Sequence, residues 1–147
     1  MGNLKDRIHR LVDAYNREDW SAASELCADD IEVIEPLLEP FKGRQAVIDF
    51  LKGQKATFPD STIVVKRLVE EGDTVVAEYV FAGTNAGPLR LPTGETIPAT
   101  NKRLSISGIS IASLDRSGKI TSQRQYYNLL EGLTQLGLMP APAAARA

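Results

Sequence analysis

The chain contains very little cysteine or histidine, the residue types that most often build disulfides and zinc sites. Cys27 and His9 are the single representatives of the two types among 147 residues. One cysteine excludes an internal disulfide, and so few cysteines and histidines cannot assemble a zinc site. We therefore expect no metal centre.

Basic clusters and long apolar runs are also absent. The formal net charge is −2, and the pair Lys102-Arg103 is too small a group to bind a phosphate backbone. No stretch approaches the roughly 18 apolar residues of a membrane span, and the first residues are polar rather than apolar. These features predict a cytoplasmic protein with neither nucleic acid nor a membrane as partner.

What the chain does contain is the composition of an ordinary globular domain. Hydrophobic residues make up 43% and charged residues 24% of it. A domain of this length can bury roughly 70% of its unfolded surface. We expect one domain over residues 1–139 and a flexible, low-complexity tail over residues 140–147.

Helical patterns fill the first part of the chain. Apolar residues recur at helical spacing over residues 4–15, Asp19 can cap a short helix over residues 20–27, and Gly43 opens a third helix that ends before Pro59. A short strand, 31–35, lies between the second and third helices and stops at Pro36. Cys27 falls on an apolar face and is expected to be buried.

Strand patterns fill the second part. We predict strands over residues 62–69, 74–84, 103–114 and 120–127, with a hairpin turn at residues 71–73. In the second of these strands, Tyr79 and Phe81 share the face that we expect to be buried. Residues 85–98 contain five Gly or Pro residues and should form a long lid or binding loop without regular structure. Helices followed by antiparallel strands indicate an α+β fold with helices on one face of a curved sheet.

The last predicted strand carries polar residues on both faces. Arg124, Tyr126 and Asn128 share one side, and alternate residues share the other. Buried polar groups need partners, so one face should meet water while the other lines a wet or ligand-filled cavity. We expect Arg124, Tyr126 and Asn128 to face the cavity, and Asn128 also to cap a helix that Gly137 ends.

The run Tyr126-Tyr127-Asn128, with Gln-Leu-Gly-Leu ten residues further along, resembles the SnoaL-like polyketide cyclases of the nuclear transport factor 2-like superfamily. Further similarity lies in residues 83–89, 92–98 and 118–120. The resemblance implies a cone-shaped α+β barrel, a small hydrophobic or aromatic ligand, and a homodimer formed through the outer face of the sheet. The chain differs from the family pattern at two positions. Asn128 stands where the family has its acid/base Asp, and Asn85 stands where many members have a His.

The resemblance also implies a set of site residues. The catalytic candidates are Asn128, Asn85 and Glu35, which precedes a proline at the expected mouth of the pocket. From the residues alone, Asn128 is sufficiently explained as a helix cap, Asn85 as a turn former and Glu35 as a solvated strand end. The expected substrate-binding residues are Trp20, Tyr79, Phe81, Arg124 and Tyr126.

Three hypotheses about function remain open. In the first, a carbonyl substrate closes a ring by an aldol reaction that needs no cofactor. Because an asparagine cannot act as the base, Asn128 and Asn85 would donate to the enolate while Glu35 or Glu78 takes the proton. In the second, the pocket opens an epoxide or hydrates a double bond, with Tyr79, Tyr126 or Tyr127 as proton donor. In the third, the chain is a non-catalytic binding module or a dimeric partner protein.

Overall fold

The structure, a computed structural model, describes residues 4–91 and 93–140. Most of the predicted tail, residues 141–147, lies outside the described residues. The elements follow one another as α1 (Leu4–Arg17), α2 (Trp20–Glu25), β1 (Cys27–Glu35), β2 (Leu38–Lys42), α3 (Arg44–Thr57), β3 (Thr62–Glu71), β4 (Thr74–Thr84), β5 (Leu89–Arg90), β6 (Thr96–Ile97), β7 (Arg103–Leu114), β8 (Ile120–Tyr127) and α4 (Leu129–Gln135).

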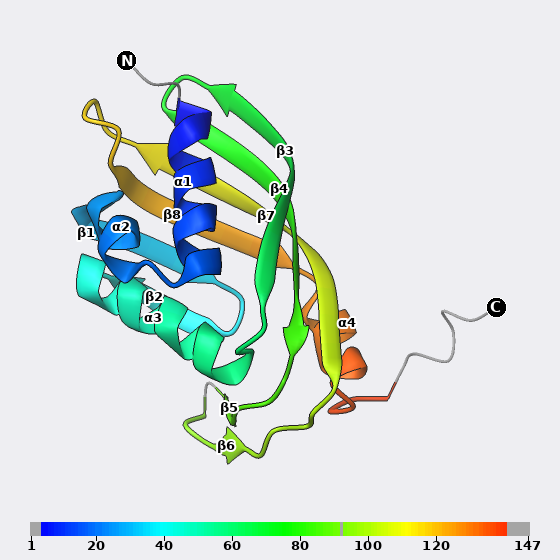
Figure 1. The fold of residues 1–147 in the computed structure, drawn as a ribbon. Helices are drawn as coiled ribbons and strands as arrows, with labels where there is room; N and C mark the ends of the chain where they lie inside the picture. Colours follow the sequence, from blue (N-terminus) through cyan, green and yellow to red (C-terminus); the bar gives the residue numbers. More distant parts are fainter. Residues whose placement is uncertain (1–3, 92, 141–147) are drawn as a thin grey trace.

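Six strands form one curved sheet in the order β2-β1-β8-β7-β4-β3 (Figure 1). β1 and β8 are parallel, and the other neighbours are antiparallel. The edge strands β2 and β3 do not pair with each other, so the sheet is open. The prediction of an α+β fold with N-terminal helices on a curved, mostly antiparallel sheet is confirmed, and the sheet is not closed.

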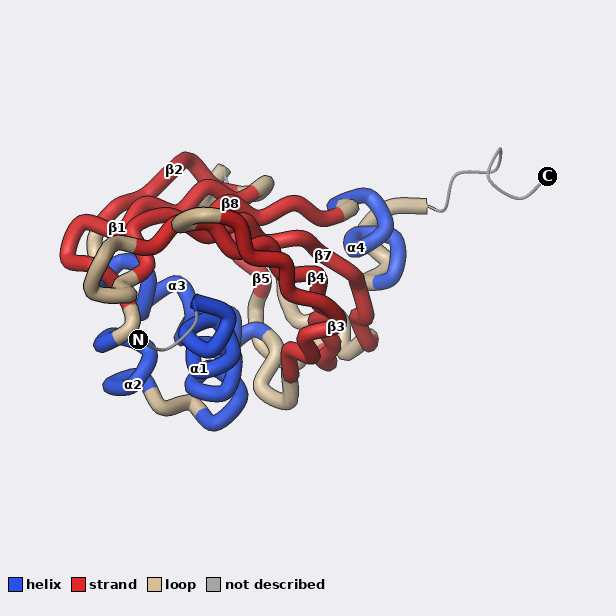
Figure 2. Tube along the Cα trace, turned by 90° about the horizontal axis from the view of Figure 1, so that it is seen from above, coloured by secondary structure: helices blue, strands red, loops and turns tan. Residues whose placement is uncertain are grey.

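Helices α1, α2 and α3 lie under the concave face of this sheet (Figure 2). The apolar sides of α1 and α3 pack against the sheet in what we call the main cluster, which consists of Ile8, Cys27, Ile31, Val33, Val47, Val75, Ala77, Ala112, Leu114 and Ile120. The helical repeat of apolar residues in α1 explains this packing, because it places Ile8 and its neighbours on one side of the helix.

The pairing of β4 with β7 decides which side chains face the helices. The two strands pair without a break from Thr74 opposite Ser113 to Thr84 opposite Arg103. Side chains alternate along each strand, so Val75, Ala77, Tyr79 and Phe81 all lie on the concave side. The prediction that Tyr79 and Phe81 share the buried face is confirmed.

Helix α4 begins and ends as the sequence predicts. The Asn128 side chain accepts a hydrogen bond from the Glu131 amide at 3.0 Å, and Gly137 adopts a φ of +76° after the last turn. Gly132 lets the helix approach the side chains of Leu104 and Ile106. These contacts belong to a second apolar group, the α4 cluster, built from Phe58, Leu104, Ile106 and Leu136.

Three local predictions differ from the structure. β1 begins at Cys27 rather than at Ile31, so Cys27 belongs to a strand and not to the second helix. Burial raises the pKa of its thiol to about 11, which disfavours the reactive thiolate. β2 was not expected, and the loop over residues 85–98 contains the short ribbon β5–β6.

A buried cation fastens the helical layer to the turn before β3. Lys55 donates to the main-chain oxygen of Ser61 at 2.6 Å and lies 4.7 Å from the ring centre of Tyr15. The Tyr15 hydroxyl in turn lies 2.7 Å from the Ser61 hydroxyl. This cluster ties α1 and α3 to one turn. Over the described ranges no helix is long and apolar enough to cross a membrane.

Candidate functional site

Polar side chains cross the concave face of the sheet between the two apolar clusters. They come from four adjacent strands, because β1, β8, β7 and β4 each change from apolar to polar at the same level of the sheet. We call this group the polar band, and it consists of Glu35, Tyr79, Ser110, Gln123, Gln125 and Tyr127. Helices α1–α3 leave Tyr79, Gln125 and Tyr127 partly exposed. These side chains of the band are therefore partly accessible to solvent.

Glu35 is the acidic group of the band. Its side chain is nearly enclosed, at 8% exposure. The Tyr127 hydroxyl donates to Glu35 Oε2 at 2.7 Å, and the Leu37 amide donates to Glu35 Oε1 at 2.8 Å. Among the described residues, no cation forms an ion pair with it. The interpretation of Glu35 as a solvated strand end is wrong, because Tyr127 gives the carboxylate a partner inside the protein.

Tyr79 is the second phenol of the band. Its hydroxyl donates to Gln125 Oε1 at 2.8 Å, across the intervening strand β7. The phenol can lie across β7 because Gly108 has no side chain, and a Cβ at that position would fall 2.5 Å from the Tyr79 oxygen. A glycine within a strand often marks such a close approach.

Both phenols are protonated at neutral pH. Burial, and then the charge of Glu35, raises the pKa of Tyr79 to about 12. Burial, the charge of Glu35 and the hydrogen bond to it raise the pKa of Tyr127 still further. Both desolvation and a nearby negative charge disfavour the phenolate. The band therefore combines one carboxyl group with two hydroxyl donors.

The side-chain amide of Gln125 has unused hydrogen-bond donors. Its Oε1 accepts the bond from Tyr79, while its Nε2 donates to no group in the part of the chain that the structure describes. The neighbouring amide of Gln123 is only weakly engaged, with Nε2 at 3.5 Å from the Ser110 hydroxyl. These two amides can donate to an oxygen of a bound molecule.

Three expected site residues face the opposite way. Arg124, Tyr126 and Asn128 all lie exposed, and Tyr126 retains 51% of its surface on the outer face of the sheet. The reason is the register of β8, in which alternate residues from Gln123 to Tyr127 pair with concave-side positions of β7. The expectation that Arg124, Tyr126 and Asn128 line the cavity is wrong.

Asn85 is buried but has no capacity left for a ligand. Its Nδ2 donates to the Gly87 oxygen at 2.8 Å and to the Thr57 oxygen at 3.4 Å. Its Oδ1 accepts from the amide and the hydroxyl of Thr100, both at 2.9 Å. Asn85 therefore fixes the long loop, and its predicted role as an enolate donor is wrong. Glu78, the alternative base, is exposed on the outer face of β4.

The two remaining aromatic candidates lie in different layers. Phe81 is on the concave face next to Tyr79 and packs edge-on against Phe58, with ring centres 5.5 Å apart. Trp20 packs against Tyr15 at 6.2 Å, within the helical layer. Phe81 can therefore contact a ligand at the band, while Trp20 supports the helices.

Sequence reasoning missed Gln123 and Gln125, and it named Tyr127 only as one of three candidate proton donors. The sequence did contain a signal for these residues. The last strand carries polar residues on both faces, so either face could be the inner one. Gly108 was a second signal of a bulky neighbour. In residues 4–91 and 93–140, no group of three or more His, Cys, Asp or Glu residues could hold a metal ion.

Three helices lie over a curved, open, six-stranded sheet, and this α+β architecture is similar to that of a solved NTF2-like protein from Cytophaga hutchinsonii. The SnoaL-like domain family matches residues 8–123. The chain therefore belongs to the SnoaL-like domain family.

Solved structures agree with this assignment. IdmH from Streptomyces antibioticus, proposed to be a polyketide cyclase, superposes with a TM-score of 0.77 at 24% identity, covering 92% of this chain and 99% of IdmH. A SnoaL-like protein of Jannaschia sp. CCS1, also proposed to be a polyketide cyclase, gives 0.78 at 22% identity over 93% of each chain. An epoxide hydrolase of M. tuberculosis gives 0.70 at 16% identity, covering 90% of this chain and 88% of that one. Such identities establish the fold, and no curated protein matches the chain.

Proposed function

We propose that the protein is a SnoaL-like enzyme that performs cofactor-free acid–base chemistry on a small hydrophobic carbonyl compound, such as ring closure of a polyketide-type substrate. The observation that carries this proposal is Glu35, a nearly enclosed carboxylate that Tyr127 holds on the concave face. A carboxylate at the end of an apolar interior is suited to take a proton from carbon and to return it.

The reaction needs one proton acceptor and one oxyanion site. Glu35 removes a proton from a carbon flanked by carbonyl groups, and the substrate delocalises the resulting charge as an enolate. The enolate carbon then bonds to a second carbonyl carbon, and the alkoxide formed takes the proton back from Glu35. No electrons are exchanged with a further reagent, so the steps balance without a cofactor.

Gln125 supplies the oxyanion site in this proposal, and Tyr79 orients it. The unused Nε2 donors of Gln125 lie on the same face as Glu35, and the Tyr79 hydroxyl holds the amide by donating its one proton to Gln125 Oε1. Gln125 thus takes the role of enolate donor that the first hypothesis gave to Asn128 and Asn85. Removing one donor of this kind costs an enzyme roughly 10²- to 10³-fold in rate. Phe81 and Phe58 offer an apolar contact for a flat ring next to these donors.

Deuterium exchange tests the proposal without knowledge of the natural substrate. 1-Indanone is a flat ketone with acidic hydrogens, and NMR in D₂O follows their replacement. The protein should accelerate exchange, and Glu35→Gln should lower the rate roughly 10²- to 10⁴-fold. Glu78→Gln on the outer face is the matched control. Equal exchange by Glu35→Gln and the parent would rule out Glu35 as the base.

An epoxide-opening reaction is the second candidate. It is supported by the same carboxyl–phenol arrangement and by the structural similarity to an epoxide hydrolase. Glu35 would accept a proton from the attacking water while Tyr79 gave its proton to the epoxide oxygen, so that a diol results. The proton on Glu35 would then return to the Tyr79 oxygen through solvent and restore the starting protein. Hydrolysis of styrene oxide, with no exchange of 1-indanone, would favour this reaction. Tight binding of 2-naphthol with neither activity would indicate a binding module.

The proposed assembly is a homodimer formed through the outer face of the sheet. This face carries no helix from α1–α3, and apolar side chains remain partly exposed along it, among them Ile34, Val76, Val80, Ile109 and Ile111. Exposed Glu78 and Arg124 flank the central strand β7, which suits a two-fold pairing of opposite charges. Light scattering should give twice the chain mass of 16.0 kDa. Ile111→Asp should yield monomers, and a monomeric parent protein would contradict the homodimer.

A further inference from the structure

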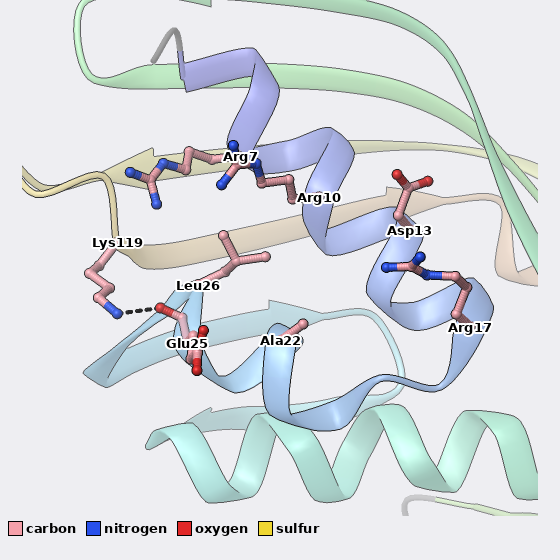
Figure 3. A pocket seen from close by; sticks show the side chains of 8 residues that line it. All are labelled: Arg7, Arg10, Asp13, Arg17, Ala22, Glu25, Leu26 and Lys119. Carbon is pink, nitrogen blue, oxygen red and sulfur yellow. Dashed lines mark hydrogen bonds between the residues drawn. The ribbon is translucent and has the colours of Figure 1, made fainter. Parts of the chain in front are cut away.

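A charged groove lies far from the polar band, between α1, α2 and the turn that joins β7 to β8 (Figure 3). Its volume is about 390 Å³, within the size range of small-molecule sites. β8 starts beside the Lys119 end of the groove, and Glu35 lies level with Gln125, five residues along this strand and roughly 17 Å away. The groove is thus a separate feature of the molecule.

Positive charge is concentrated in this groove. Arg7, Arg10 and Arg17 project from one side of α1, because their spacing of three and seven residues follows the helical repeat. Lys119 adds a fourth cation from the turn. Two carboxylates, Asp13 and Glu25, line the groove with these four cations, although the whole chain has a net charge of −2.

Two of the arginines have no acidic partner. Arg10 pairs with Asp6 at 2.9 Å, and Lys119 donates to the main-chain oxygen of Glu25. Arg7 and Arg17 form neither an ion pair nor a side-chain hydrogen bond within the described ranges. Their guanidinium donors are available to a bound anion.

The turn also holds Arg7 in place. Its guanidinium lies against Gly118, where a Cβ would fall 2.9 Å from Arg7 Cζ and Nε. Gly118 has a φ of +85°, and the Asp115 carboxylate fixes the turn by accepting from the amides of Ser117 and Lys119. A cation that is positioned before binding loses less freedom when an anion arrives.

We propose that the groove binds a small phosphorylated molecule, with its phosphate at the end formed by Arg7 and Lys119. Arginine forks match the geometry of phosphate oxygens, and a phosphate carries enough charge to benefit from several cations. Asp13 and Glu25 accept hydrogen bonds from hydroxyl or amino groups of the same ligand. They would also repel a broad anionic surface, which favours a small soluble molecule over a membrane.

Titration with inorganic pyrophosphate tests this site. At constant ionic strength set with chloride, amide NMR shifts should saturate and should be confined to α1, residues 22–26 and residues 117–120. Arg7→Gln should weaken binding roughly 10- to 100-fold, since it removes a charge-assisted contact. Arg116→Gln is the matched control, because Arg116 lies exposed in the same turn and outside the groove. It should bind as the parent does.

Lys119→Gln is the second variant if Arg7→Gln does not fold, because Lys119 lies at the same end of the groove. It should weaken pyrophosphate binding while leaving the exchange of 1-indanone unchanged, so this test is independent of the proposed enzyme activity. Absence of saturation, or equal losses in Lys119→Gln and Arg116→Gln, would overturn the proposal. Binding to phosphatidylglycerol vesicles without binding to pyrophosphate would overturn it as well.

Discussion

The main cluster and the polar band lie on the same strands and the same face of one sheet, yet their side chains differ in kind. In the main cluster Ile31, Val75 and Ile120 have no exposed surface. One or two positions further along the same face of each strand, the side chains are the carboxylate, phenols and amides of the band. An apolar core alone would stabilise the sheet, so the change to polar residues calls for a different explanation.

Burial of the polar side chains of the band lowers the free energy of unfolding, whereas burial of the apolar side chains of the main cluster does not. A buried polar group is unfavourable unless another group satisfies it. Here Tyr127 satisfies Glu35, and Gln125 satisfies Tyr79. These two hydrogen bonds limit the unfavourable free energy of burial but leave amide donors unused. A ligand site requires polar groups that are held in place and only partly satisfied, and this property distinguishes the band from the main cluster.

The largest expected effect is on stability, in the main cluster. Ile120→Ala should lower the free energy of unfolding by about 2–5 kcal/mol, because it leaves a cavity in a fully enclosed site. Urea unfolding measures this. Val64→Ala on edge strand β3 is the control, since Val64 is 50% exposed and should change stability by less than about 1 kcal/mol. Similar losses at both positions would contradict the assignment of the main cluster as the core.

A second prediction concerns the two faces of β8. Gln125→Leu should reduce the exchange of 1-indanone roughly 10²- to 10³-fold, because it removes the donor proposed for the enolate oxygen. Arg124→Leu, one residue earlier on the outer face, should leave the rate near that of the parent. If Arg124→Leu caused the larger loss, the orientation of the strand in this account would be wrong.

Gly108→Ala should disturb the band through Tyr79. The added methyl group would fall 2.5 Å from the Tyr79 oxygen, so the phenol must move away from Gln125. We expect a loss of about 1–3 kcal/mol in unfolding free energy together with slower exchange. Gly53→Ala in α3 is a matched control with nothing within 4 Å of the added atom. It should stabilise the protein slightly. Two variants of equal stability would argue against close packing of Tyr79 on β7.

The last prediction is a pH dependence of stability. Burial raises the pKa of Tyr15, Tyr79 and Tyr127, so the folded state holds their protons above pH 10 while the unfolded chain releases them. The unfolding free energy should therefore fall as pH rises from 10 to about 12. Tyr127→Phe should reduce this fall, and Tyr126→Phe controls for loss of a phenol on the outer face. Stability that does not change over this window would show that the phenols are not buried beside a charge.

Much of the fold follows from local signals in the sequence. The bounds of β4, the Asn128 cap and the stop at Gly137 depend on neighbouring residues, and all three agree with the structure. β2 did not follow, because Pro40 usually breaks a strand. It is tolerated here because β2 lies at the edge of the sheet.

The site depended on information that local patterns do not carry. Which face of β8 points inward is decided by its pairing with β7 and its parallel pairing with β1. Glu35 is buried because Tyr127, 92 residues away in the chain, donates to it. Alternation alone gave the two candidate faces correctly, and the resemblance to the family directed the choice to the wrong one.

The central claim is that the polar band, rather than the outer face of β8, receives the ligand. A crystal structure of the complex with 2-naphthol, a flat aromatic alcohol shaped like an enol, tests it most directly. The account predicts the naphthol oxygen within hydrogen-bonding distance of Gln125 Nε2 or Glu35, with the rings against Phe81. Rings seated on Tyr126 and Arg124, with the band unchanged, would contradict it.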